Sequence, residues 1–330
     1  MTDASKTPWV ALTLGDPAGI GPELSLRLCA QDAVRASANL LLVGPGALIP
    51  SDIERVREPL ELPDARGGLL AFETEGDPAD WQPGVDEAAS GRAALAALRA
   101  GHELAVRGIV DALVTSPVSK RALHMAGERC EGQTELLGRW CDVERFQMTV
   151  RFEELTVMLL TRHLPLVKAL EEIHVERVLD HLRLLDETLR ASGVDAPRLG
   201  LAGLNPHAGE VGILGSEEQE VLIPARDAAR DEGLDVEGPL SPDSMFAETN
   251  RRRFDGLLTL YHDQAFLPLK LLAKDRGVTV LAGLPYPRVS PIHGTAYDLV
   301  GTGKASHENL AEAVHVAARI APHWKTTNRA

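Results

Sequence analysis

Short runs of apolar residues alternate along this chain with longer segments whose apolar residues recur at helical spacing. The apolar runs predict buried strands, and they cover 10–14, 40–43, 112–115, 155–160, 199–204, 257–261 and 278–281. The helical spacing predicts helices near 91–108, 164–172, 174–192, 216–232 and 307–321, with another that begins near Pro22. Strands that alternate with helices form βαβ units, so we expect an α/β protein with mostly parallel sheets.

The composition narrows the class of protein further. Of the 330 residues, 44% are hydrophobic and 25% are charged, which is typical of a folded globular chain and excludes a disordered one. The net charge of −14 argues against nucleic acid and membrane surfaces as partners. The segment 59–90 is rich in Pro, Gly, Asp and Glu, and we expect an irregular surface excursion there.

The cysteines and the first residues bear on the compartment. The three cysteines include no C-x-x-C pair, so neither a disulfide framework nor a thiolate zinc site is predicted. No apolar stretch has the length of a signal peptide or a membrane span. We therefore expect a cytoplasmic protein.

Three histidines share one context in the sequence. His163, His207 and His262 each follow a predicted buried strand within a few residues. Ligands of open α/β sheets bind at the carboxyl ends of the strands, so the three imidazoles are candidates for a divalent metal site. On spacing alone, three unrelated and hydrogen-bonded loop histidines explain the pattern as well.

A glycine-rich loop, GDPAGIGPE at 15–23, follows the first predicted strand and opens a helix. Gly19 and Gly21 allow close backbone approach, and a helix N-terminus favours an anion. The order of the glycines is not that of the ordinary dinucleotide fingerprint, G-x-G-x-x-G. From the residues alone, a phosphate-binding loop and a plain tight turn both remain open.

Several further residues are candidates for chemistry. Lys270 and Arg288 are cations that suit a proton donor and a bidentate anion ligand, or else lie on the surface. Asp243 is a candidate base, although a helix cap before SMF explains it equally well. The segment HGTAYD at 293–298 has small residues that suit a flat ring, or form only a turn.

Taken together, these motifs resemble the 4-hydroxythreonine-4-phosphate dehydrogenase family of vitamin B6 biosynthesis. The resemblance covers nearly the whole chain, and its motifs occur in order as GDPAGIGPE (15–23), TSPVSK (115–120), GQTELL (132–137), TRHLPL (161–166), GLNPHAGE (203–210), GPLSPDSMF (238–246), YHDQ (261–264), LPLK (267–270), GLPYPRVS (283–290) and HGTA (293–296).

The resemblance implies the architecture of isocitrate and isopropylmalate dehydrogenases, with two α/β domains and an interdomain cleft. One domain is expected to combine residues 1–131 with 294–330 and to bind the dinucleotide. Residues 132–293 are expected to form the metal, substrate and dimerisation domain. The family further implies a homodimer in which each active site is shared between the two chains.

The resemblance also assigns roles to residues. The implied metal ligands are His163, His207 and His262, with zinc as the first expectation and cobalt or magnesium as alternatives. The implied catalytic groups are Lys270 and Asp243. The implied contacts of the phosphorylated substrate are Gln133, Thr134, Lys270, Thr279 and Arg288. The implied contacts of NAD or NADP are Gly19, Gly21, His293, Gly294, Thr295 and Ala296.

The sequence departs from the family pattern at two substrate positions. Gln133 stands where histidine is usual, and Thr279 stands where asparagine is common. Glutamine neither carries charge nor shuttles a proton. The first expectation is oxidation and decarboxylation of 4-phosphohydroxy-L-threonine to 3-amino-2-oxopropyl phosphate. The alternatives are a related dehydrogenase of 4-phosphothreonate, 4-phosphoerythronate or a cyclic diol acid.

Two other classes of protein fit parts of the pattern. Three histidines at strand ends also suit a zinc hydrolase, which needs no dinucleotide. A binding protein that closes on a small anion would hold a ligand without turnover. Absence of NAD or NADP binding would indicate the hydrolase, and one bound ligand without turnover would indicate the binding protein.

Overall fold

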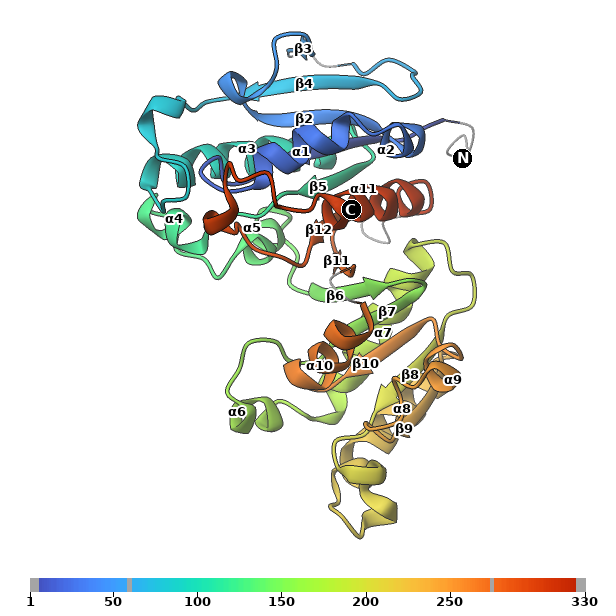
Figure 1. Ribbon diagram of the computed structural model, residues 1–330. Helices are drawn as coiled ribbons and strands as arrows, with labels where there is room; N and C mark the ends of the chain where they lie inside the picture. The colour runs from blue at the N-terminus through green and yellow to red at the C-terminus, as the bar shows by residue number, and fades with distance from the viewer. Residues whose placement is uncertain (1–5, 58–60, 274–275, 325–330) are drawn as a thin grey trace. The chain divides into compact units, whose positions relative to one another are not determined.

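The computed structural model describes residues 6–57, 61–273 and 276–324, and they form two compact units (Figure 1). The first unit comprises 1–144 and 278–330, and the second comprises 145–277. These boundaries differ from those expected at 131/132 and 293/294. The reason is that the helix Gln133–Trp140 and the strands Val278–Ala282 and Arg288–Pro291 pack within the first unit.

A seven-stranded sheet forms the centre of the first unit. Its order is β3 (Glu54–Val56), β4 (Leu69–Thr74), β2 (Asn39–Pro45), β1 (Trp9–Thr13), β5 (Ala112–Thr115), β12 (Arg288–Pro291) and β11 (Val278–Ala282). All neighbouring strands run parallel except β11 and β12. Segments from both ends of the chain thus share one sheet.

Helices cover both faces of this sheet. The first unit contains α1 (Gly21–Cys29), α2 (Asp32–Ser37), α3 (Ala88–Val106), α4 (Lys120–Met125), α5 (Gln133–Trp140) and α11 (Glu308–Ile320). Alternate residues of β1, such as Val10 and Leu12, join α1, α2 and α11 in one apolar core. The opposite face meets α3, where a Cβ added at Gly101 would lie 2.8 Å from Leu113. Both faces are therefore buried, as expected of parallel strands.

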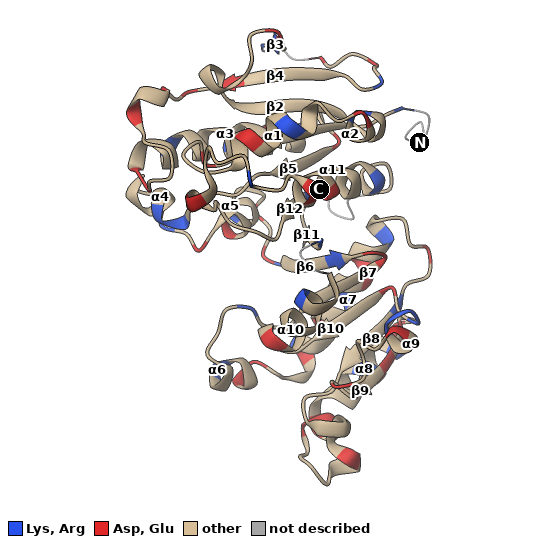
Figure 2. Cartoon of the chain, in the orientation of Figure 1, with Lys and Arg blue, Asp and Glu red and all other residues tan. Residues whose placement is uncertain are grey.

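Five strands form the centre of the second unit. The order is β6 (Gln147–Phe152), β7 (Leu155–Leu159), β10 (Gly256–Thr259), β8 (Arg198–Ala202) and β9 (Asp235–Leu240). Only the β6–β7 hairpin is antiparallel. The helices are α6 (Leu166–Glu171), α7 (Val175–Ala191), α8 (Ile223–Asp231), α9 (Glu248–Arg251) and α10 (His262–Ala273). Figure 2 shows the charged residues of both units mainly on helices and loops.

The structure confirms the α/β class, and each apolar run predicted as a strand forms one. The segment 59–90 is not wholly irregular, because β4 lies within it and pairs with both β2 and β3. None of the helices within the described residues combines the length and apolar character that crossing a lipid bilayer requires.

Candidate functional site

The three candidate histidines follow three neighbouring strands of the second unit. β10 pairs in parallel with β7 on one side and with β8 on the other. His163 follows β7, His207 follows β8 and His262 opens α10 directly after β10. The structure confirms that all three lie beyond the carboxyl ends of adjacent strands, which is the edge where open α/β sheets bind ligands.

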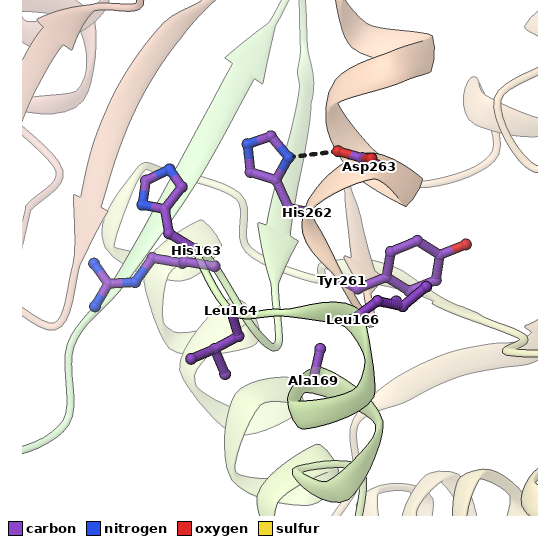
Figure 3. Close-up of a pocket in the computed structure, with 8 residues that line it drawn as sticks. His163, Leu164, Leu166, Ala169, Tyr261, His262 and Asp263 are labelled. Atoms are coloured by element: carbon purple, nitrogen blue, oxygen red, sulfur yellow. Dashed lines mark hydrogen bonds and ion pairs between the residues drawn. The ribbon is translucent and has the colours of Figure 1, made fainter.

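Two of the histidines contact each other. The ring centroids of His163 and His262 are 5.4 Å apart, and Figure 3 shows the two imidazoles side by side. Both line a cavity of about 290 Å³ whose wall also includes Tyr261 and Asp263. Nδ1 of His262 lies 2.7 Å from Oδ1 of Asp263. This hydrogen bond assigns the proton to Nδ1 and leaves the Nε2 lone pair for a metal, an arrangement common in metal sites.

His207 is held apart from that pair on an unusual turn. The segment Pro206–Gly212 contains six successive residues with positive φ, from His207 (φ 54°) to Gly212 (φ 92°). Within the part of the chain that the structure describes, no three His, Cys, Asp or Glu side chains cluster closely enough to hold a metal. The structure therefore brings together His163 and His262, and the three-ligand site stays a prediction.

The turn that carries His207 is fixed by a buried carboxylate. Glu218, only 1% exposed, accepts hydrogen bonds through Oε1 from the backbone N–H groups of Leu204 (2.8 Å) and Asn205 (2.7 Å). Its Oε2 accepts a third from Nδ2 of Asn205. Burial raises the pKa of Glu218, but these hydrogen bonds outweigh it and lower the pKa overall. Sequence reasoning missed Glu218 because the residue faces the turn only in the fold.

The two predicted catalytic groups also lie in the second unit. Lys270 is exposed on α10, the helix that His262 opens. Asp243 is exposed, and Oγ of Ser241 donates a 2.6 Å hydrogen bond to its Oδ1. That bond lowers the pKa of Asp243, and the charge of nearby His207 adds to the effect. Asp243 is therefore an ionised carboxylate near His207, and it is not the expected helix cap because residues 244–246 form a turn and α9 begins at Glu248.

The predicted anion ligands lie in the first unit around a buried guanidinium. Arg288 is 3% exposed, and its Nη2 donates to Oγ1 of Thr115 at 2.7 Å. Burial lowers the pKa of Arg288 to about 10. Among the described residues, Nε of Arg288 and Oε1 of Gln133 have no hydrogen-bond partner although both are buried. Unpaired buried polar atoms are costly, so this place suits a polar ligand.

The first unit also contains the other two predicted substrate residues, Thr134 and Thr279, beside Gln133. Nε2 of Gln133 donates to the carbonyl of Ser116 at 3.1 Å, next to the Thr115 that holds Arg288. Thr134 follows on α5. Thr279 is buried in β11 and pairs with Ser290 of β12. The structure thus connects Gln133 and Arg288 through the successive residues Thr115 and Ser116 at the end of β5, while Thr279 belongs to the adjoining strand pair.

The two predicted dinucleotide segments contact each other in the first unit. The N–H of Ile20 donates to the carbonyl of Thr295 at 3.1 Å. A Cβ on Gly19 would lie 3.1 Å from that same carbonyl, and a Cβ on Gly21 would lie 2.3 Å from the carbonyl of Leu14. Close backbone approach therefore excludes a Cβ at position 21 and leaves little room for one at position 19. His293, Gly294 and Ala296 belong to the same loop, so the structure brings the predicted set together.

The first of these segments also contains a buried acid, Asp16, for which the sequence predicted no role. Asp16 is fully buried and accepts hydrogen bonds from the hydroxyl of Tyr297 (2.7 Å) and the N–H of Ala18 (2.9 Å). Burial raises the pKa of Asp16, and these hydrogen bonds partly offset the increase. Its position inside GDPAG was the one available signal, but the partner Tyr297 is remote in sequence.

Comparison with known proteins places this chain in a family. The profile described as "Pyridoxal phosphate biosynthetic protein PdxA" matches residues 29–317. The 4-hydroxythreonine-4-phosphate dehydrogenase of Geobacter metallireducens is 39% identical, and the match covers 95% of this chain and 96% of that protein. The D-threonate 4-phosphate dehydrogenase of Salmonella typhimurium is 37% identical, over 96% of this chain and 100% of that protein.

A solved structure agrees with the sequence comparison. The crystal structure of 4-hydroxythreonine-4-phosphate dehydrogenase from Klebsiella pneumoniae superposes with a TM-score of 0.86 at 34% identity, covering 95% of this chain and 99% of that one. The match confirms the resemblance that the motifs indicate. The chain therefore belongs to the PdxA family of pyridoxal phosphate biosynthetic proteins, a family of dehydrogenases.

Proposed function

We propose that this protein oxidises and decarboxylates 4-phosphohydroxy-L-threonine to 3-amino-2-oxopropyl phosphate, with NAD or NADP as the hydride acceptor. The observation that carries the proposal is the contact of His163 and His262 at neighbouring strand ends in a chain of this family. The reaction removes a hydride and a proton from the substrate's secondary alcohol. The resulting β-keto acid loses CO₂, and the carbon atom that carried the carboxylate then takes up a proton.

We assign a divalent metal to His163 and His262, with His207 as the third ligand. Neutral imidazoles suit zinc or cobalt, and magnesium prefers oxygen ligands. The ion would act as a Lewis acid toward the substrate hydroxyl. The hydrogen bond between His262 and Asp263 supports the assignment, since Nδ1 donates it and Nε2 is the ring nitrogen left to bind a metal.

Proton transfer is assigned to two residues of the second unit. Asp243, whose pKa is lowered by Ser241, is an ionised carboxylate able to accept the hydroxyl proton. In the proposed homodimer it would serve the partner's site. Lys270 would supply the proton to the carbon that loses CO₂. Its exposed ammonium on α10 supports this role, because it stands on the helix that carries His262.

Recognition of the substrate phosphate is assigned to Arg288, Gln133 and Thr134. The unpaired Nε of Arg288 points to this role, because an incoming phosphate oxygen would satisfy it. The amide of Gln133 can donate one further hydrogen bond. The dinucleotide is assigned to the contacting loops 15–23 and 293–296, where glycine leaves the backbone accessible.

A homodimer is part of the proposal. Leu166, Val167 and Leu170 of α6, with Leu267 and Leu271 of α10, are between 43% and 80% exposed. Both helices belong to the second unit and border the histidine cavity. Clustered exposed apolar side chains mark interaction surfaces. A second copy would bury them and bring the partner's residues near the histidines.

A second candidate substrate is 4-phospho-D-threonate. Relatives named D-threonate 4-phosphate dehydrogenase match this chain at 36–37% identity, similar to those named for 4-hydroxythreonine-4-phosphate. Gln133 replaces the usual histidine at a substrate position, which favours a change in substrate. The oxidation and decarboxylation would be the same for either compound.

The test is NAD(P)H absorbance with zinc-loaded protein, offering 4-phosphohydroxy-L-threonine, 4-phosphothreonate and 4-phosphoerythronate separately, with and without a chelator. Chelator-sensitive reduction with the first compound supports the proposal. Turnover of only the two acids that lack the amine would retain the mechanism and change the substrate. Absence of reduction with all three would refute the proposed substrate class.

A further inference from the structure

A chain of buried hydrogen bonds joins the three loops that carry the histidines. Oγ1 of Thr161 donates to the carbonyl of Leu260 at 2.8 Å. The N–H of Leu260 donates to Oε1 of Gln264 at 2.7 Å. Nε2 of Gln264 then donates to the carbonyl of Gly203 at 2.8 Å. We call these four residues the buried clamp; its side chains Thr161 and Gln264 are 1% and 7% exposed.

Each histidine loop contributes to the clamp. Thr161 precedes His163 by two residues, and Leu260 precedes His262 by two. Gly203 lies at the end of β8, shortly before the turn of His207. The clamp therefore links the carboxyl ends of β7, β10 and β8 through side chains and not only through the strand ladder.

The amide of Gln264 is fixed in one orientation. Its oxygen accepts from the N–H of Leu260, and its nitrogen donates to the carbonyl of Gly203. Rotating the amide by 180° would place two donors together at Leu260 and two acceptors together at Gly203. Because the side chain is buried, each lost bond would leave a backbone group unsatisfied. Through these two bonds the side chain of Gln264 joins the segment of His262 to that of His207.

A shift of Gly203 would reach the turn of His207 through Ala208. A Cβ added to Gly203 would lie 3.0 Å from Cα of Ala208 and 3.1 Å from the carbonyl of Leu240. The N–H of Gly203 also donates to that carbonyl at 2.7 Å. Gly203 is thus packed against the residue that follows His207, and its carbonyl is held by Gln264.

We propose that Gln264 is a positioning residue that sets the spacing between the loops of His262 and His207, and so the affinity of the histidine site for a divalent metal. This inference rests on the proposed function in one respect, namely that the histidines bind a metal. Outer residues that orient metal ligands commonly change affinity by about 10- to 100-fold when replaced.

The test compares Gln264→Met, which keeps the side-chain length and removes both hydrogen bonds, with Leu189→Ala. Leu189 is 1% exposed and packs on Gly256, at the end of β10 opposite the histidines. Its replacement lowers stability in the same unit without touching the clamp. Co²⁺ is titrated into each protein, with affinity read by chelator competition and geometry by the visible absorption bands. Hydrogen exchange of 203–209 is measured without metal.

We expect Gln264→Met to weaken Co²⁺ binding by about 10- to 100-fold, to change the absorption bands and to accelerate exchange in 203–209. Leu189→Ala should retain Co²⁺ affinity within about twofold at temperatures where it is folded. If Gln264→Met does not fold, Thr161→Val and Gln264→Glu are used, since each removes or reverses one bond of the clamp.

Unchanged Co²⁺ affinity and unchanged exchange in a folded Gln264 variant would overturn the inference. An equal effect of Leu189→Ala on Co²⁺ affinity would also overturn it, because general destabilisation would then suffice. If the unaltered protein binds no Co²⁺, the metal part of the proposed function fails. The exchange of 203–209 then decides whether Gln264 holds the His207 turn.

Discussion

The hydroxyl of Tyr297 donates a hydrogen bond of 2.7 Å to the fully buried carboxyl group of Asp16. This bond connects the loop 15–23 to the segment that follows His293. The two loops also meet through the backbone of Ile20 and Thr295. The proposed dinucleotide site is therefore built on a polar contact between residues from opposite ends of the chain.

Replacing Tyr297 with Phe removes this bond and leaves Asp16 with fewer donors. We expect the dissociation constant for NAD or NADP to rise about tenfold, because a hydrogen bond to a carboxylate contributes roughly 1.5–3 kcal/mol. Calorimetric titration of the dinucleotide measures the effect. Asp298→Asn, at an exposed neighbouring position, is the control. Equal affinity of Tyr297→Phe and the unaltered protein would show that the loops hold without this bond.

Replacing Arg288 with Lys tests the phosphate assignment. Lysine cannot reproduce the planar fork that reaches Thr115 and presents a second N–H. We expect KM for the phosphorylated substrate to rise at least about tenfold, with a smaller change in kcat. The surface variant Arg252→Lys should behave like the unaltered enzyme. A normal KM in Arg288→Lys would mean that the buried guanidinium only supports the fold.

Replacing Glu218 with Ala removes the acceptor of three N–H groups at the start of the His207 turn. We expect a loss of about 2–3 kcal/mol in unfolding free energy, because three partly buried donors lose their acceptor. Glu218→Gln retains one oxygen and should recover more than half of that loss. Denaturant unfolding of both variants provides the measurement. Similar losses in the two variants would contradict the role of the hydrogen bonds.

Replacing His207 with Ala tests the third metal ligand. We expect turnover and bound metal to be lost together, as they should be after treatment with a chelator. Metal analysis and the NAD(P)H assay on the same sample give both readouts. His323→Ala, at an exposed position, is the matched control. Activity that persists in the metal-stripped His207→Ala protein would refute the metal mechanism.

The stability of the protein should depend on the protonation of His181. Its Nδ1 lies 2.8 Å from the carbonyl of Arg177, and its Nε2 lies 3.2 Å from Nε2 of Gln147. The oxygen of Gln147 accepts from Met148 N–H, so its nitrogen faces the imidazole. A proton on Nε2 of His181 would point at the N–H donor of Gln147, and the two donors would repel each other. Burial is the main cause that lowers the pKa of His181 below 6.5.

The unfolded chain therefore binds the proton more readily than the folded one between that lowered pKa and 6.5. Stability should fall as the pH decreases through this window, and His181→Gln should make the fall less steep. Thermal unfolding of both proteins across the range measures the two slopes, with exposed His323→Gln as the control. Identical slopes for His181→Gln and the unaltered protein would contradict the prediction.

The sequence predicted the elements whose signals are local. The buried parallel strands appear as apolar runs, and three of them correctly located the histidines at one edge. β6 was not predicted, because its buried residues include polar ones such as Gln147 and Thr149, which interrupt the apolar run. β12 is short and ends in proline, so its pairing with β5 and β11 has no local signature.

The features that shape the site depend on contacts between remote residues. The left-handed turn of His207 contains four non-glycine residues with positive φ, for which local sequence gives no indication. Glu218 and the clamp residue Gln264 hold it from other segments. Asp16 and Tyr297 likewise meet only in the fold. Motif order identified the family, whereas these supporting groups required the structure.

The discontinuous first unit has a consequence for how the chain is synthesised. All of residues 145–277, the second unit, are translated before β11, β12 and α11. Until then β5 presents an unpaired edge, and the sheet face that α11 covers is open to solvent. Such edges promote association between unfinished chains. The first unit is thus completed only by elements that are translated after the whole of the second unit.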